Sequence, residues 1–327
     1  MIQQICSDIY RIAVVLPQNP LKYLNSYVII GKERNLIIDT GFNRPECLEA
    51  LQEGLAELHL DMNRTDIFVT HLHADHSGLA ASIKQPGSAV YMSSVDKELL
   101  NTTLQSPEFY WKAIEEIFFR EGYPREELDK ARTHNPARKF VSGQNFSCNL
   151  MFDGDIVLAG DRKLECILTP GHTPGHMCLY DRKEKIMFTG DHLLFDITPN
   201  IATWQSMPEA LEKYMGSLEK IRDYDVRVTL TGHRENNGDF RQRILALLKH
   251  HQERLADIKK IIVENPGING YYVASKMKWS IRANGWEDFP PGQKWFAVGE
   301  AIAHLNYLTD KGEINRNDQD GVRTYWI

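Results

Sequence analysis

Short β-rich runs alternate with amphipathic segments through residues 1–239. Residues 27–30 (Tyr-Val-Ile-Ile) and 36–38 (Leu-Ile-Ile) flank a polar turn and predict a hairpin. Residues 45–58 predict a helix, because leucines recur along one face and Pro45 suits the first turn. Further strands are predicted at 66–70, between 140 and 188, and at 226–230, with a helix at 208–222. Two β-rich blocks, each followed by helices, predict an α+β sandwich with two sheets inside and helices outside.

Residues 95–135 interrupt this pattern with a helical, aromatic insert. Its aromatic side chains are Phe109, Tyr110, Trp111, Phe118, Phe119 and Tyr123. A stripe of aromatics at helical spacing is commonly part of a core. The alternative is a lid over an apolar acyl group, since ligand pockets are mostly apolar. The pattern leaves both roles open.

The last part of the chain predicts three helices and a hairpin. A long helix is expected at 240–264, closed by Asn265-Pro266-Gly267, and shorter ones at 272–277 and 294–309. Two strands are expected around Asp320-Gly321. Three helices followed by a hairpin is the element order of a winged helix. We therefore expect a catalytic domain at 1–239 and a winged-helix-like domain at 240–327.

The composition is that of a folded chain. Of 327 residues, 42% are hydrophobic and 25% are charged, which excludes a disordered or collagen-like protein. No apolar run approaches the ~20 residues of a membrane helix, and the N-terminus reads as a strand rather than a signal peptide. Five scattered cysteines make a poor disulfide framework, so we expect a cytoplasmic protein. A net charge of −6 argues against a chain built to coat nucleic acid.

Residues 71–76 read His-Leu-His-Ala-Asp-His, directly after a predicted strand. Three imidazoles and a carboxylate in six residues suit Zn²⁺; a histidine-rich surface loop is the alternative. Three later segments also place a histidine or aspartate just past a strand and a glycine: Thr169-Pro170-Gly171-His172, Thr189-Gly190-Asp191 and Thr231-Gly232-His233. We expect these strand ends to converge on one rim. His176 either orients His172 or is a structural histidine.

In this order, the segments HLHADH, TPGHTPGH, FTGD and TGH resemble the metallo-β-lactamase superfamily, across residues 8–240. The resemblance implies an αββα sandwich with a two-metal site at one edge of the sheets. It implies that the first metal is bound by His71, His73 and His172, the second by Asp75, His76 and His233, and that Asp191 bridges the two. Asn25 and Asp39 match positions that serve structure more than chemistry.

The resemblance implies two zinc ions, although iron and manganese bind the same ligands. Two ions ~3.5–4 Å apart hold a hydroxide and polarise a carbonyl or phosphoryl oxygen. The hydroxide would attack directly, with Asp75 and Asp191 as the catalytic carboxylates and without a serine or cysteine nucleophile. We therefore predict a di-zinc hydrolase that cleaves a small ester or thioester.

Single residues separate this chain from several relatives. Asp191 supplies the bridging aspartate that di-zinc β-lactamases lack, so antibiotic hydrolysis is not expected. His73 stands where flavodiiron proteins carry glutamate. His172 and Asp191 are nineteen positions apart, which excludes the inserted domain of the larger ribonucleases. The chain thus resembles glyoxalase II, small thioesterases, lactonases and compact endoribonucleases, although the basic glutathione-binding residues of glyoxalase II are not matched.

The charge of the C-terminal part bears on the partner. Residues 241–327 carry 13 Lys and Arg against 10 Asp and Glu, and the presumed recognition helix has few cations. We therefore favour a module that packs on the catalytic domain or a twin subunit over one that reads nucleic acid. The alternatives are an endoribonuclease or phosphodiesterase with the same two metals, a sulfur dioxygenase with one iron, and a DNA-binding protein. The expected partner is a small ester or thioester, no membrane is expected, and a homodimer is the base-rate expectation.

Overall fold

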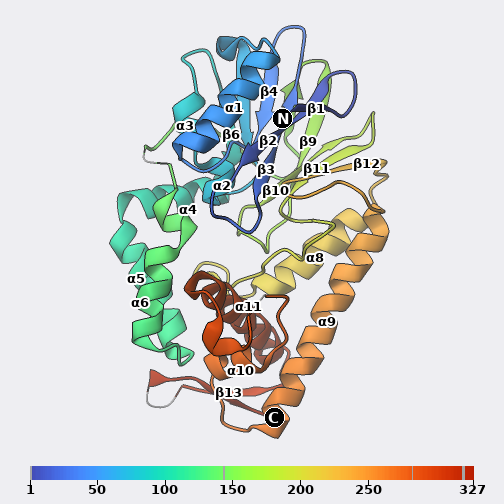
Figure 1. The fold of residues 1–327 in the computed structure, drawn as a ribbon. Coiled ribbons are helices and arrows are strands. Elements are labelled where there is room, and N and C mark those ends of the chain that lie inside the picture. Colours follow the sequence, from blue (N-terminus) through green and yellow to red (C-terminus); the bar gives the residue numbers. More distant parts are fainter. Residues whose placement is uncertain (1, 143, 282, 319–320) are drawn as a thin grey trace.

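Two stacked β-sheets form one half of the molecule and helices form the other, as Figure 1 shows. The computed structural model describes residues 2–142, 144–281, 283–318 and 321–327. In the view of Figure 1 the sheets lie at the top, and the aromatic insert and the C-terminal helices lie below them. The predicted α+β sandwich is confirmed.

The first sheet has seven strands in chain order. They are β1 (Ile2–Gln4), β2 (Ile9–Val15), β3 (Tyr23–Ile29), β4 (Asn35–Ile38), β5 (Thr65–Val69), β6 (Val90–Ser93) and β7 (Asn149–Met151). The predicted hairpin is confirmed, since β3 and β4 are antiparallel with Tyr27 opposite Ile38. From β4 to β7 the neighbours run parallel. The carboxyl ends of β4, β5 and β6 therefore share one edge of the sandwich.

The second sheet has five strands. In spatial order they are β12 (Val228–Thr231), β11 (Ile186–Gly190), β10 (Met177–Asp181), β9 (Arg162–Leu168) and β8 (Ile156–Ala159). Only β11 and β12 are parallel neighbours in this sheet. The turn from β9 to β10 and the ends of β11 and β12 therefore lie at the same edge.

Helices cover the outer faces of both sheets and build the lower half. In the first part of the chain these are α1 (Pro45–Glu57), η1 (Met62–Arg64), α2 (Ala74–Ser77) and α3 (Ala80–Ile83). The insert is α4 (Ser94–Gln105), α5 (Pro107–Arg120), α6 (Arg125–His134) and α7 (Pro136–Lys139). After it come α8 (Ala210–Arg222), α9 (Phe240–Glu264), α10 (Gly270–Lys276), η2 (Trp286–Asp288) and α11 (Pro291–Asp310). Pro45 is in the first turn of α1 as predicted, and Asp239 starts α9 by accepting the N–H of Gln242 at 2.7 Å.

Alternation along the strands divides the apolar side chains among three clusters. On β3, Tyr27 and Ile29 point between the sheets, whereas Leu24 and Val28 pack under α1. On β10 the alternate residues pack between the sheets and against the helical half. Both faces of β3 and of β10 are buried, which explains why these strands read as nearly continuous apolar runs.

The aromatic insert packs against the C-terminal helices. Trp111 and Phe118 are buried, and Phe118 stacks on Trp295 of α11 with ring centroids 4.2 Å apart. Phe109 is 72% exposed and lies outside this stripe. The structure therefore shows that Trp111 and Phe118 are part of the core.

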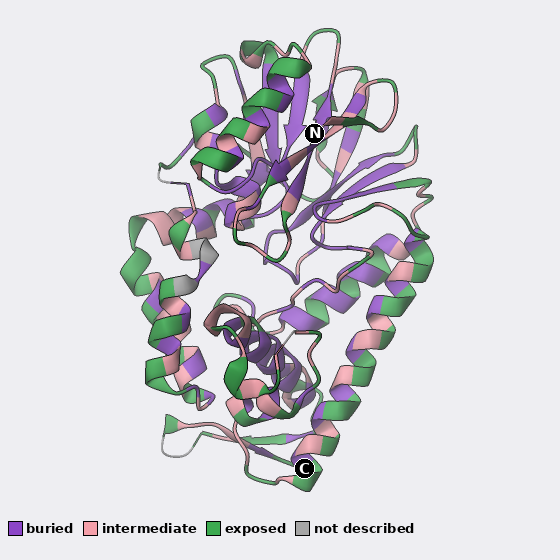
Figure 2. Cartoon of the chain, viewed as in Figure 1, coloured by how far each residue is buried: buried purple, intermediate pink, exposed green. Residues whose placement is uncertain are grey.

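The C-terminal part contains the predicted helices and a hairpin of β13 (Asn315–Asn317) and β14 (Thr324–Trp326). The predicted turn residue Asp320 lies outside the described residues. Figure 2 shows α11 almost wholly buried, and Val298, Ile302 and Leu305 are fully covered. The side chains of this presumed recognition helix are thus engaged in packing, in agreement with the favoured role. Within the described ranges, no helix is long and apolar enough to cross a membrane.

Candidate metal centre

The seven predicted ligands follow four strand ends at the edge of the sandwich that faces the helical half (Figure 1). Four of them lie just after β5, in residues 71–76, and the others follow β9, β11 and β12. The structure brings all seven together. Their ligand atoms form three overlapping groups, each within 4.8 Å: His71, His73 and His172; His71, His76 and Asp191; and Asp75, His76 and His233.

Two glycines allow the loops to come this close. Gly190 has φ +46°, and a Cβ there would lie 2.8 Å from both Nε2 of His176 and Oγ1 of Thr70. A Cβ on Gly232 would lie 2.5 Å from Oδ1 of Asp191. A larger residue at either position would push a ligand loop away from the cluster.

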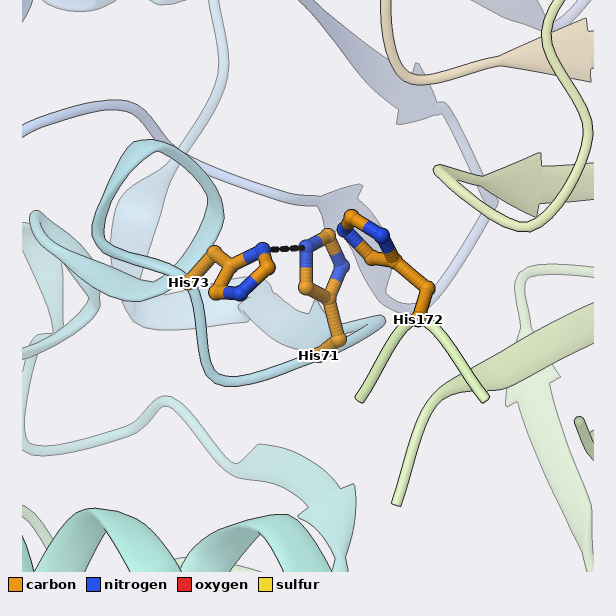
Figure 3. Close-up of side chains that lie close together, drawn as sticks. All are labelled: His71, His73 and His172. Atoms are coloured by element: carbon orange, nitrogen blue, oxygen red, sulfur yellow. Dashed lines mark hydrogen bonds between the residues drawn. The ribbon is translucent and has the colours of Figure 1, made fainter. Parts of the chain in front are cut away.

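Three imidazoles converge in the first group, as Figure 3 shows. Nε2 of His71 lies 3.1 Å from Nδ1 of His73. This separation is close to the ~3.3 Å between two ligands of a tetrahedral zinc ion with bonds of ~2.05 Å. Nε2 of His172 is buried and has no hydrogen-bond partner within the described part of the chain. The group therefore presents three nitrogens that fit one cation.

Asp191 lies between the two halves of the cluster. Its Oδ2 is 3.7 Å from Nε2 of His172 and 3.5 Å from Nε2 of His233. Its Oδ1 is 3.5 Å from Nε2 of His76. Asp75 lies on the second side, with Oδ2 3.3 Å from Nε2 of His233. One carboxylate therefore reaches both groups of histidines.

Backbone carbonyls orient two of the rings through their Nδ1 atoms. Nδ1–H of His172 donates to the carbonyl of Asn200 at 2.9 Å, and Nδ1–H of His233 donates to the carbonyl of Tyr23 at 2.9 Å. Because a carbonyl only accepts, Nε2 of each ring carries the lone pair when the ring is neutral. Both lone pairs therefore point into the cluster in the tautomer that binds a metal.

Asp39 orients two more rings from behind. Its Oδ2 accepts from Nδ1–H of His76 at 2.7 Å and from Oγ1–H of Thr70 at 2.8 Å. Oγ1 of Thr70 then accepts from Nδ1–H of His71 at 3.0 Å. Burial disfavours a charged His76, but Asp39 and Asp191 outweigh it and raise its pKa well above the usual value. The two carboxylates therefore favour a positive charge at this ring, which either a proton or a metal ion would supply.

Two residues named from the sequence hold ligand loops. Nδ2 of Asn25 donates to two backbone carbonyls of residues 231–234, at 3.0 and 2.8 Å. Nε2 of His176 accepts the N–H of Asp191 at 3.2 Å. The suggestion that His176 orients His172 is wrong, since the structure gives that role to a backbone carbonyl. His176 positions Asp191 instead.

His71, His73 and Asp75 have the charge states that bind cations. Burial, followed by the neighbouring imidazoles, lowers the pKa of His71 well below its usual value. Burial and the ring of His172 lower the pKa of His73 to about 3. Burial opposes ionisation of Asp75, but the contact with His233 lowers its pKa to about 2. Burial opposes a charge on His233, but Asp191 and Asp75 raise its pKa. At neutral pH the cluster thus offers ionised carboxylates, neutral rings at His71 and His73, and protons on His76 and His233 that a metal ion would displace.

The donor set fits two divalent cations. Five imidazoles and two carboxylates meet in one largely buried cluster. Nitrogen and oxygen donors of this kind suit zinc and also iron and manganese, so the donors do not select one of these metals. The His/Asp cluster is typical of a binuclear site.

No sequence motif marks the residues that hold these loops from outside, and fully buried Asp96 is one of them. Its Oδ2 accepts the N–H of Leu72 at 2.8 Å and the hydroxyl of Thr173 at 2.7 Å. Its Oδ1 accepts the N–H of Gly175 at 2.6 Å. Burial raises the pKa of Asp96 to about 6. In the sequence it looks like an ordinary acid in the first turn of a helix after the cap Ser93, so no local signal marks it.

Asp96→Ala is expected to lower the free energy of unfolding by about 2–3 kcal/mol, because three donors, two of them fully buried, lose their acceptor. Urea unfolding followed by circular dichroism measures this change. The matched control is Asp61→Ala, which removes a surface cap of η1 and should cost about 1 kcal/mol or less. Equal stabilities of the two variants would refute the bridging role of Asp96.

Comparison with known proteins agrees with this geometry. Residues 21–233 match the model of the metallo-β-lactamase superfamily. The chain belongs to the metallo-β-lactamase superfamily. Residues 289–326 match a second model, the metallo-β-lactamase-like C-terminal domain. The αββα sandwich of this superfamily is therefore followed by a C-terminal helical domain.

Relatives match across most of the chain. The probable metallo-hydrolase YqjP of Bacillus subtilis is 26% identical over 317 residues, covering 92% of this chain and 89% of that protein. The acyl-coenzyme A thioesterase MBLAC2 of Homo sapiens is 27% identical over 206 residues, covering 60% of this chain and 66% of that protein. The crystal structure of a metallo-β-lactamase family protein from Thermus thermophilus superposes with a TM-score of 0.83 at 27% identity, covering 99% of both chains.

Proposed function

We propose that this chain is a di-zinc hydrolase that cleaves a small ester or thioester. The observation that carries the proposal is the position of Asp191, whose carboxylate lies within 3.7 Å of a histidine from each group of ligands. Membership of the metallo-β-lactamase superfamily supports a metal-dependent hydrolase. Similarity to an acyl-coenzyme A thioesterase supports a thioester as the substrate class.

Each side chain has a stated role in this proposal. One ion would be held by His71, His73 and His172, the other by Asp75, His76 and His233, and Asp191 would contribute to both sites. When bound, two divalent ions lower the pKa of water towards ~7 and polarise the carbonyl oxygen of the substrate. Asp75 and Asp191 remain ionised and retain the ions by their charge. Trp204 stacks on His73, with ring centroids 5.9 Å apart, and offers an apolar wall beside the reacting centre.

We assign residues 1–239 to the catalytic domain and 240–327 to a winged-helix-type module that packs on it. The burial of α11 supports packing over nucleic-acid recognition, because a recognition helix must expose one face to a groove. A cytoplasmic location is part of the same proposal, since all five cysteines are free.

The test combines metal analysis with a substrate panel. The purified chain is analysed by elemental mass spectrometry and assayed with an acyl-coenzyme A thioester, a lactone, a phosphodiester and single-stranded RNA. We expect about two zinc ions per chain, as two-metal hydrolases hold, and turnover of the thioester or lactone. Chelator-treated protein is the control and should be inactive until zinc is returned.

Three outcomes would contradict the proposal. A chain that binds no metal would remove its basis. RNA cleavage that falls steeply with salt would indicate an endoribonuclease. One iron per chain with oxygen uptake on a persulfide would indicate a sulfur dioxygenase.

A further inference from the structure

The loop between β11 and α8 is attached to the C-terminal helix α11. Nδ2 of Asn200 donates to Oε2 of Glu300 at 3.0 Å and to the carbonyl of Phe296 at 3.3 Å. The N–H of Thr203 donates to the carbonyl of Gly299 at 3.2 Å. Three contacts within one turn of α11 therefore fix the position of residues 200–203.

The same loop holds His172 at two points. The carbonyl of Asn200 accepts Nδ1–H of His172 at 2.9 Å. Nε1–H of Trp204 donates to the carbonyl of His172 at 3.2 Å. Both the ring and the backbone of this histidine thus depend on a loop whose other side is bound to α11.

Glu300 is the side chain of α11 that accepts a hydrogen bond from Asn200. It is 6% exposed, and a buried carboxylate requires charged or polar partners. Its Oε1 lies 3.1 Å from Nε of Arg254 on α9, and its Oε2 accepts from Asn200. The guanidinium of Arg254 is itself held over the ring of Trp279, 4.3 Å from the centroid. The carboxylate is therefore fixed on one side and bound to the loop on the other.

We propose that Glu300 is a positioning residue for His172: through Asn200, the C-terminal helix holds the carbonyl that sets the ring of this ligand. The inference rests on the proposed metal centre and extends it into the C-terminal domain. The hydrogen bond from Nδ1 sets the tautomer and the direction of Nε2, and loss of such an outer partner typically weakens metal binding about 10–100-fold. On this view the C-terminal domain tunes one metal site from outside the sandwich.

A purely structural role for Glu300 predicts a different result, and Glu121 provides the matched control. Glu121 is also a fully buried carboxylate between the insert and the C-terminal part. Its partners are Arg323 at 3.1 Å and the hydroxyl of Tyr325 at 2.9 Å, and these bonds do not involve the loop at 200–204. Glu121→Gln should reduce stability without changing the metal site.

The experiment measures both zinc affinities by competition with a chromophoric chelator in full-length wild type, Glu300→Ala, Glu300→Gln, Asn200→Ala and Glu121→Gln. We expect Glu300→Ala to weaken one zinc site about 10–100-fold and to leave the other near the wild-type value. Asn200→Ala should weaken the same site, because it removes the link and keeps the backbone carbonyl. Glu300→Gln should have a smaller effect, because its amide oxygen still accepts from Asn200.

A second readout does not depend on zinc. In chelator-treated protein with ¹⁵N-labelled histidine, Nδ1–H of His172 should give a slowly exchanging signal that is lost or shifted in Glu300→Ala and Asn200→Ala but not in Glu121→Gln. Wild-type zinc affinities in Glu300→Ala and Asn200→Ala would overturn the inference and leave the proposed function standing. If the wild type bound no zinc, the proposed function would fail, and an unchanged His172 signal in both variants would overturn the inference as well.

Discussion

Asp191→Ala is expected to abolish most of the hydrolytic activity and to reduce the bound zinc. The Asp191 carboxylate is 3.5 Å from Nε2 of His76 and of His233 and 3.7 Å from Nε2 of His172, so no other single side chain among the described residues reaches both groups as an anion. Loss of about 4 kcal/mol of charge stabilisation corresponds to a fall of about 10³-fold in kcat/KM. We expect zinc to drop from about two ions per chain to about one.

Steady-state kinetics and elemental analysis of the same preparation measure both effects. Asp191→Asn keeps the volume and removes the charge, so it should lose nearly as much activity as the alanine variant. Asp225→Ala is the matched control, because Asp225 is exposed on the surface and forms an ion pair with Lys185 rather than with a candidate ligand. A variant at position 191 that hydrolyses as fast as the wild type would refute the two-metal proposal.

Metal removal is expected to destabilise the fold as well as to stop catalysis. The cluster contains buried ligand atoms that a cation would coordinate. Among them, Nε2 of His172 and Oδ1 of Asp191 have no hydrogen-bond partner in the described chain. A ligand present at 1,000 times its dissociation constant stabilises the native state by about 4 kcal/mol. Chelation should therefore lower the free energy of unfolding by about that amount, relative to protein kept in free zinc at about 1,000 times the dissociation constant.

Urea unfolding with zinc and with a chelator measures this difference, and returned zinc should restore both stability and activity. The control is a His71→Ala, His76→Ala double variant, which removes a ligand from each group. Its unfolding midpoint should be the same with and without chelator. A wild-type unfolding midpoint that is the same with and without chelator would show that the cluster holds no stabilising ion.

Much of the fold could be predicted because its patterns are local. The helix at 45–58 follows from leucines on one face, and the long helix at 240–264 matches α9 at both ends. The hairpin of β3 and β4 follows from two apolar runs around a polar turn. The sandwich followed from the order of these elements. The sequence did not decide whether the aromatic insert is part of the core or forms a lid. Burial of Phe118 against Trp295 answers that question for this side chain, and it depends on a contact between segments far apart in the chain.

The candidate ligands could be identified from residue order, since each lies just after a strand, and strand ends at one edge of a sandwich converge. Side chains that hold the ligands could not be identified in this way. Asp96 is 24 residues from Leu72 and 79 from Gly175, and Glu300 is 100 residues from Asn200. The spacing of residues within a motif carries no information about partners that are so far apart along the sequence. Elements, strand ends and ligand types are therefore determined by short-range sequence. The orientation of His172 and the coupling of α11 to the metal centre exist only when distant segments pack. The reason is that a hydrogen bond forms only between atoms that the tertiary fold brings within about 3 Å.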